Sequence, residues 1–253
     1  FSTQGSAGGP QGMINISFID EVTLSTSSFG VEYDNPLSGV LQFNQKNGNP
    51  KEISGNFRFG ASDSAITIEG PISSDKTTFI FSARKSYLQF LFKLIGLPIR
   101  PDYWDFQGKI NHKINEYNTI NFIGLGAIDD FSVEAPEDFD FTQQSFLEQV
   151  PIIKQNSTTL GVSWIRKFKE SKGQFILALS TNKLKNIFSR YYDNENLEGL
   201  YFKNDSHEWE TKLRAKTINY INDWKITWGA NIQYSDYYNN TSDILNQLDY
   251  ITK

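Results

Sequence analysis

The chain has 253 residues, a formal net charge of −5, two histidines and no cysteine. Disulfides and thiolate chemistry are therefore excluded, a zinc site is disfavoured, and the acidic balance argues against a nucleic-acid partner. No run of about 18 apolar residues is present, so a membrane-spanning helix is excluded and only a closed β-barrel could carry this sequence through a bilayer.

Residues 1–47 are rich in glycine, serine and asparagine, and their glycines are spaced like turn residues. Two short strands are predicted, at 19–24 and 39–43. We assign residues 1–47 to a small separate element. The sequence opens at Phe1 without an initiator methionine or a signal peptide, and we expect it to be a fragment.

Residues 48–253 show a different pattern, in which apolar and polar residues alternate because successive side chains of a strand point to opposite faces. The clearest segment is 208–216, where a charged row lies opposite Trp209, Leu213 and Ala215. About nine such segments occur, each near the ~9–11 residues that cross a bilayer as a tilted strand. They are 53–59, 66–70, 78–85, 104–111, 118–128, 159–164, 174–180, 208–216 and 224–234.

The connections between these segments alternate in length. Short polar turns are predicted at 73–76, 115–117, 169–173 and 219–223, and long connections at 87–102, 129–156 and 188–205. Outer-membrane barrels have short periplasmic turns and long extracellular loops. The sequence therefore predicts an all-β fold, a partial transmembrane antiparallel β-barrel of about nine strands.

The alternation also predicts which side chains face lipid and which face a wet lumen. The lipid-facing set is Phe57, Phe79, Phe106, Trp164, Leu177, Leu213 and Trp228. The lumen charges are Arg58, Arg84, Lys109, Glu208, Glu210, Lys212 and Arg214.

An odd number of strands leaves two unpaired edges, whereas bacterial single-chain barrels have even strand numbers. We therefore expect that 53–61 and 224–234 do not pair with each other and that the sheet is an open arc.

Four strings near the start of the chain, Phe1–Gly5, Gly8–Asn15, Phe18–Val22 and Glu32–Val40, resemble the second half of the plug of TonB-dependent outer-membrane receptors. The closest resemblance is to the Bacteroidetes type, which carries a carboxypeptidase-like regulatory domain before the plug. It continues at 67–72, 79–87 and 124–131. The resemblance implies that 1–47 is the C-terminal part of a plug, with the motif Tyr33, Ser38, Gly39 and Val40, and that 48–253 is the N-terminal part of a 22-stranded barrel.

A loop after the fifth predicted strand is strongly acidic and lacks lysine and arginine up to residue 148. Its carboxylates could bind Ca²⁺, attract a cationic substrate, or form a solvated loop. We expect no bound metal and name the loop as a candidate ligand-binding site. The candidate residues are Asp129, Asp130, Glu134, Glu137, Asp138 and Asp140.

Three further features have structural as well as functional interpretations. The apolar stretch 86–97 suits a short helix that covers the barrel mouth, docks a surface lipoprotein or packs locally. The lumen charges either touch substrate or pair with the plug and one another. The tryptophans at 104, 209 and 224 are expected in the interface girdles. His112 and His207 have no companions at a catalytic spacing, so we expect no enzyme activity and no cofactor.

The leading hypothesis is a plug-gated receptor for active ligand uptake in the bacterial outer membrane. Its implied partners are outer-membrane lipid, TonB with its inner-membrane energising proteins, and a surface lipoprotein or other outer-membrane subunits. An alternative is a receptor-like barrel that serves as a structural subunit of an outer-membrane complex. A soluble all-β enzyme or carbohydrate-binding module is a third hypothesis, disfavoured by the regular alternation of turn lengths.

Overall fold

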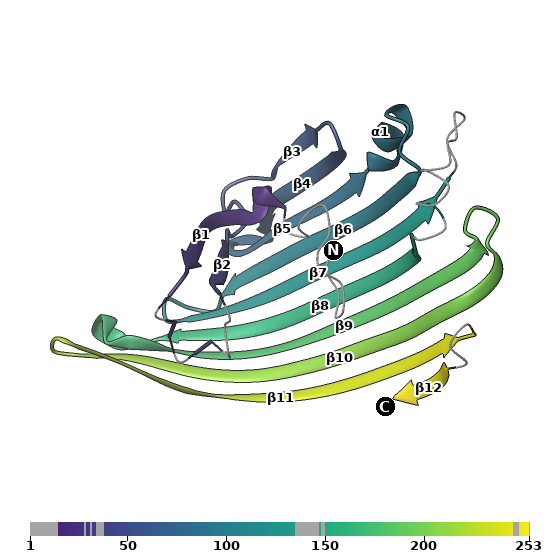
Figure 1. Cartoon of the computed structure of the whole chain (residues 1–253). Helices are drawn as coiled ribbons and strands as arrows, with labels where there is room; N and C mark the ends of the chain where they lie inside the picture. Colours follow the sequence, from purple (N-terminus) through teal and green to yellow (C-terminus); the bar gives the residue numbers. More distant parts are fainter. Residues whose placement is uncertain are drawn as a thin grey trace.

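The structure, a computed structural model, describes residues 15–27, 29–30, 32–33, 38–134, 147, 150–244 and 248–252. Most of these residues form one antiparallel sheet of ten strands, which we call the wall. Its strands are β3 Ser54–Phe59, β4 Asp63–Ile72, β5 Ser74–Ser86, β6 Ile99–Lys113, β7 Asn118–Val133, β8 Ile152–Lys167, β9 Gly173–Asp193, β10 Glu198–Ile221, β11 Trp224–Asp243 and β12 Leu248–Thr252 (Figure 1).

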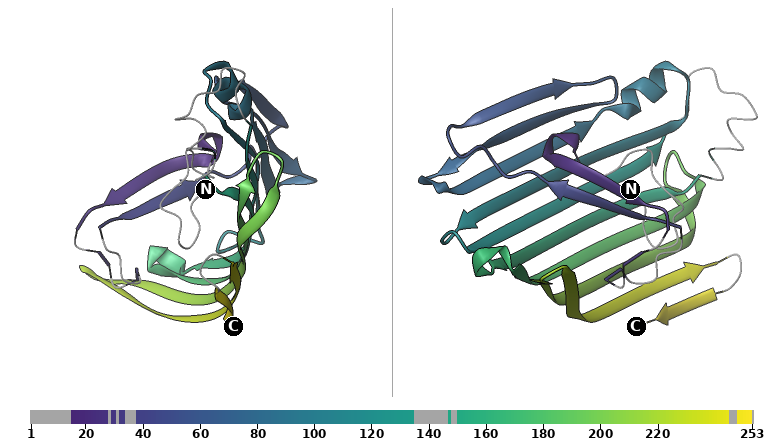
Figure 2. Two further views of the ribbon diagram at one scale, coloured as in Figure 1. Left: turned by 45° about the vertical axis from the view of Figure 1, so that its right-hand side comes forward. Right: turned by 90° about the vertical axis from the view of Figure 1, so that its left-hand side faces the viewer.

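The wall is an open arc in which every strand pairs with its neighbours in sequence. The order runs β12-β11-β10-β9-β8-β7-β6-β5-β4-β3, so β3 and β12 are its two edges and β3 does not pair with β11. Figure 2 shows the arc curving around a hollow on its concave side. The chain thus adopts the all-β architecture of part of an antiparallel barrel wall, rather than a small closed barrel.

The two faces of the wall have opposite character, as the alternation predicts. Along β5, residues 78, 80, 82, 84 and 86 are buried, whereas the residues between them are more exposed. The buried face includes Arg84 and Ser82, and the exposed face carries Phe81. Polar side chains thus fill much of the buried row, together with Ile80, whereas a soluble sheet buries mainly apolar side chains.

The predicted lipid-facing residues lie on the convex face. Phe57 and Trp228 are 70% and 63% exposed. Trp164 pairs with Leu177, and Phe79 pairs with the exposed Ile110. The girdle candidates Trp104, Trp209 and Trp224 are also exposed on this face. An exposed apolar face of this size marks a surface that contacts protein or membrane.

A small hairpin lies in the hollow of the arc (Figure 2). A 3₁₀ turn, η1 Ile16–Phe18, leads into β1 Ile19–Ser25, which pairs antiparallel with β2 Val40–Gln45. These two strands form their own sheet, separate from the wall. We call η1, β1 and β2 the inner hairpin.

The expected short helix is present as α1 Leu88–Leu94, directly after β5. Gly96 follows with a φ of 73°, a left-handed conformation that favours glycine and ends the helix. Phe90 and Leu94 are exposed on α1. No helix in the described part of the chain is long and apolar enough to span a bilayer.

Two predicted connections are wrong. β7 continues to Val133 and β8 begins at Ile152, so Asp129 and Asp130 lie on a strand and not on the expected loop 129–156. Instead of a long loop at 188–205, β9 continues to Asp193 and β10 begins at Glu198, so the two strands form an extended hairpin. Two aromatic pairs join these strand ends, with ring centroids 5.8 Å apart for Phe188 and Phe202 and 5.0 Å apart for Tyr192 and Tyr201. Cross-strand aromatic pairs stabilise a ladder, and here they extend it beyond the predicted strand.

Candidate functional site: the interface between inner hairpin and wall

Asn15 fixes the start of the inner hairpin to the wall. Its side chain is 1% exposed, and its Nδ2 donates a hydrogen bond of 2.7 Å to Ser82 Oγ on β5. Its Oδ1 accepts from the backbone N–H of Ser17, 3.1 Å away, so the turn before β1 is held by the same residue. The neighbouring Phe18 is fully buried. A buried amide with its partners satisfied favours one position of the hairpin.

Glu69 and Lys109 hold the chain at the same end of the hairpin, where β2 ends beside the start of β1. Lys46, directly after β2, forms a 3.0 Å ion pair with Glu69 on β4, and the backbone N–H of Asn49 donates to the second oxygen of the same carboxylate at 3.1 Å. Lys109 Nζ on β6 donates to the backbone carbonyl of Gln45 at 2.7 Å. Wall charges thus bind the chain where it passes from the hairpin to β3.

A third contact joins the hairpin to the opposite part of the arc. Lys216 on β10 forms an ion pair with Glu32, which lies between β1 and β2. Because β10 is distant from β4 to β6 in the sheet order, the hairpin contacts two separated parts of the wall.

A buried ion pair lies on the same concave face. Arg84 Nε on β5 and Asp105 Oδ2 on β6 are 2.6 Å apart, and their side chains are 7% and 2% exposed. The two residues face each other in the ladder, and the Arg84 guanidinium lies 5.7 Å from the ring centre of Tyr103. Arg58 and Asp63 form a second pair at 2.8 Å.

All seven predicted lumen charges lie on the concave face, but they have different surroundings. Arg58, Arg84 and Lys109 are engaged as described. Glu210 pairs with Lys212 at 2.8 Å. Among the described residues, Glu208 and Arg214 form no ion pair. In the described part of the chain, Lys109 is thus the one of these seven charges that bonds the chain at the inner hairpin, whereas Arg58, Arg84 and Lys212 pair with carboxylates of the wall.

The acidic residues are not brought together as one site in the described part of the chain. Asp129 faces the concave side opposite Tyr103, and Asp130 faces the convex side opposite Asp102. Glu134 accepts hydrogen bonds of 2.8 Å from Lys93 and Arg100, which lower the pKa of its carboxyl. Glu137, Asp138 and Asp140 lie outside the described residues. No cluster of possible metal ligands occurs in the described ranges.

The two histidines have individual partners. His112 Nδ1 lies 2.8 Å from Thr77 Oγ1, and His207 stacks on Tyr238 with ring centroids 4.9 Å apart. In the candidate plug motif, the Tyr33 N–H donates to the Gly30 carbonyl at 3.1 Å, and Val40 begins β2 opposite Ser25. The sequence could not identify Asn15, Glu69 or Lys46 as interface residues, because single polar residues carry no periodic signal.

The chain is similar in fold to a solved structure, the alcaligin outer membrane receptor FauA from Bordetella pertussis. The two share 9% identity with a TM-score of 0.57, and the match covers 89% of this chain and 35% of the receptor chain. The chain thus spans about a third of that receptor's length. No protein-family model matches the sequence, and no curated protein matches it. At this identity the likeness shows the fold alone, part of an antiparallel β-barrel.

Proposed function

We propose that this chain is part of a TonB-dependent receptor of the Bacteroidetes type in the bacterial outer membrane, with residues 1–47 from the plug and 48–253 from the barrel. The observation that carries the proposal is the inner hairpin bound to the concave face of the wall through Asn15, Lys109 and Glu69. The fold likeness to an outer membrane receptor supports the same assignment.

The proposed activity is binding and gated uptake rather than bond breaking. Polar and ionic contacts between the hairpin and the wall can be exchanged for water at modest net free energy, about 0.5–1.5 kcal/mol for a typical hydrogen bond. A plug held by such contacts would seal the lumen at rest and move when TonB and the inner-membrane energising proteins pull on it. A surface lipoprotein or other outer-membrane subunits are further proposed partners, and the acidic residues after β7 are proposed to contribute to ligand capture.

A crosslink between hairpin and wall tests this proposal in the full-length protein. The natural chain has no cysteine, so Asn15→Cys with Ser82→Cys introduces the only thiols in this part of the protein. A short reducible bifunctional thiol reagent should then abolish energised uptake and leave ligand binding unchanged. Reduction of the crosslink should restore uptake. If the protein is instead a purely structural subunit, the same crosslink should have no effect on the outer-membrane complex to which the protein belongs.

The matched control places the same crosslink inside the wall. Ser163 and Ala178 face each other in the β8–β9 ladder, so joining Ser163→Cys to Ala178→Cys links two strands that are already paired. Uptake should survive that crosslink. If uptake is undiminished when hairpin and wall are covalently joined, plug gating is overturned. If the full-length protein is recovered outside the outer-membrane fraction, the proposed location is overturned.

A further inference from the structure

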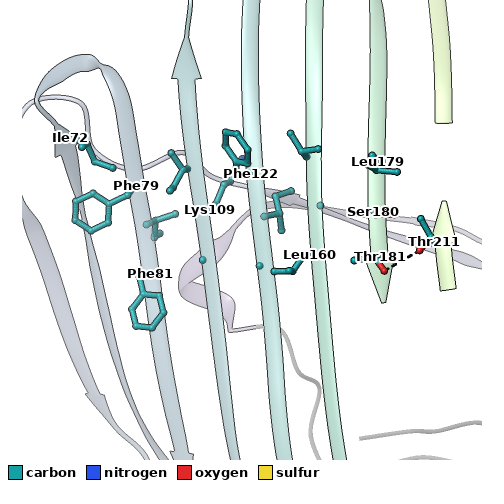
Figure 3. Close-up of a pocket in the computed structure, with 17 residues that line it drawn as sticks. Ile72, Phe79, Phe81, Lys109, Phe122, Leu160, Leu179, Ser180, Thr181 and Thr211 are labelled. Carbon is teal, nitrogen blue, oxygen red and sulfur yellow. Dashed lines mark hydrogen bonds between the residues drawn. The ribbon is translucent and has the colours of Figure 1, made fainter. Parts of the chain in front are cut away.

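The convex face of the wall has a depression of about 730 Å³ in its apolar belt. Figure 3 shows it between the side chains of Phe81 on β5 and Leu160 on β8. These two residues belong to one row of the ladder, in which Phe81 pairs with Gly108, Gly108 with Gly124, and Gly124 with Leu160. Two adjacent glycines therefore form the floor of a groove, and large apolar side chains form its sides.

The backbone does not require glycine at either floor position. Neither glycine has a positive φ. A Cβ at Gly108 would lie 3.7 Å from Phe81 Cδ2, and a Cβ at Gly124 would lie 3.6 Å from Leu160 Cδ2, both ordinary van der Waals distances. Glycine weakens a strand interior and is often found where another group approaches closely. At these two positions, the space that glycine leaves opens away from the hairpin, toward the proposed lipid.

Two lysines lie beyond one end of this groove, and no ion pair joins either of them to another described residue. Leu179 and Thr181 on β9 line the groove, and the next two residues of the same parity are Lys183 and Lys185, both exposed. Each step of two residues along a strand is about 7 Å. Lys183 pairs across the ladder with Thr158 and Trp209, so no acid is its direct neighbour.

A third cation, Lys154 on β8, lies near this pair but has Asp130 opposite it on β7. Among the described residues, none of these three lysines forms a salt bridge. From the groove, Lys183 and Lys185 lie toward the Asp193 end of β9. Figure 1 shows α1 at that end of the wall, and the end with the long connections is the extracellular one in outer-membrane barrels. An apolar groove that leads to two neighbouring lysines is complementary to an anionic lipid.

The polar groups at the rim are satisfied by one another. Trp209 Nε1 donates to Thr181 Oγ1 at 2.7 Å, and Thr181 Oγ1 lies 3.1 Å from Thr211 Oγ1. Because these groups bond within the wall, the groove presents an apolar surface. Trp209 is also the kind of residue that lies at the headgroup level of a membrane, which places Lys183 and Lys185 near lipid phosphates.

We propose that this groove is a binding site for one phosphate-bearing lipid of the outer leaflet, with an acyl chain over Gly108 and Gly124 and the phosphate at Lys183 and Lys185. The inference rests on the outer-membrane location proposed above. The lipid would occupy the convex face, whereas the ligand path proposed above lies on the concave face.

The test uses the full-length protein, purified from outer membranes in mild detergent, delipidated, and titrated with diphosphoryl lipid A while native mass spectrometry counts the bound lipid. Replacing two lysines, Lys183→Gln with Lys185→Gln, should weaken binding by about tenfold or more, since each lysine near an anionic headgroup contributes about 1 kcal/mol. Filling the groove with Gly124→Leu should weaken it several-fold. The control Lys167→Gln with Lys169→Gln removes the same charge at the other end of the wall.

Two further ligands distinguish a lipid from a free anion. Dephosphorylated lipid A and inorganic phosphate should each bind at least about tenfold more weakly than the complete lipid. The first lacks the phosphates that the lysines would bind, and the second lacks the acyl chains that the groove would bind. Equal binding of inorganic phosphate, or no effect of Gly124→Leu, would overturn the groove as an acyl site. Equal loss in the Lys167 and Lys169 control would overturn the role of Lys183 and Lys185. Absence from the outer membrane would refute the proposed function itself, whereas outer-membrane protein without lipid preference would refute only this inference.

Discussion

Removal of one partner from the buried ion pair between Arg84 and Asp105 should strongly destabilise the wall. In the Asp105→Ala variant, the guanidinium of Arg84 stays on a face where its side chain is 7% exposed. Breaking a buried pair in this way costs about 3–5 kcal/mol, because the Arg84 charge loses the Asp105 carboxylate on a face with little hydration.

The geometry indicates why this pair differs from a surface pair. At the 2.6 Å separation of Arg84 Nε and Asp105 Oδ2, the Coulomb attraction is about 6 kcal/mol at an effective dielectric constant of about 20 and about 1.6 kcal/mol in water. Desolvation of both groups cancels much of the larger value. The intact pair therefore contributes little net stability, but removal of either partner alone is costly.

The assay is urea unfolding of the full-length protein in detergent, followed by tryptophan fluorescence. The double variant Arg84→Met with Asp105→Leu should recover most of the loss, because neither charge remains unpaired. The control is Lys172→Ala, whose ion pair with Glu170 is 66% and 74% exposed and should contribute no more than about 1 kcal/mol. If Asp105→Ala costs no more than Lys172→Ala, or if the double variant is as unstable as the single one, the argument from burial is refuted.

Three other predictions concern the inner hairpin and the connections. Hydrogen bonds from Lys93 and Arg100 lower the pKa of Glu134, so the contact between α1 and the end of β7 contributes stability above the unfolded pKa of about 4.3–4.5 and loses it as the pH falls through the folded pKa. The protection factor of the Glu134 N–H, which bonds the Pro98 carbonyl at 2.9 Å, is its exchange rate corrected for the intrinsic pH dependence of amide exchange. It should fall on acidification in the natural chain but hardly change with pH in Glu134→Gln. Gly48→Ala should loosen the connection from hairpin to wall by about 1–3 kcal/mol, because a Cβ there would lie 2.0 Å from the Phe79 carbonyl oxygen. Limited proteolysis near residue 48 should detect the change, with Gly30→Ala, whose Cβ meets only ordinary contacts, as the unaffected control. Asn194→Ala should destabilise the β9–β10 turn by about 1–3 kcal/mol. The buried Asn194 side chain donates to the carbonyls of Leu147 and Val150 and accepts from the Tyr191 N–H. If the Tyr191 N–H in the variant is protected from hydrogen exchange as well as in the natural chain, this reasoning is contradicted.

Sequence alone determined the character of the wall. Alternation along β5 and β10 follows from the two-residue period of any strand, so the apolar row with Phe81 and the charged row with Lys212 could be placed on opposite faces without coordinates. Gly96 likewise marked the end of α1, because the left-handed conformation that ends a helix favours glycine.

The tertiary structure decided everything that depends on which residues become neighbours. Asn15 meets Ser82 across 67 positions of sequence, and no local pattern links two such residues. The extension of the β9–β10 hairpin depends on ring contacts such as Phe188 with Phe202, which exist only once the strands are in register. The groove has the same origin, because Gly108 and Gly124 are ordinary strand glycines until the ladder places them side by side. Periodicity is a local property of the chain, whereas register and docking are set by pairing between distant segments.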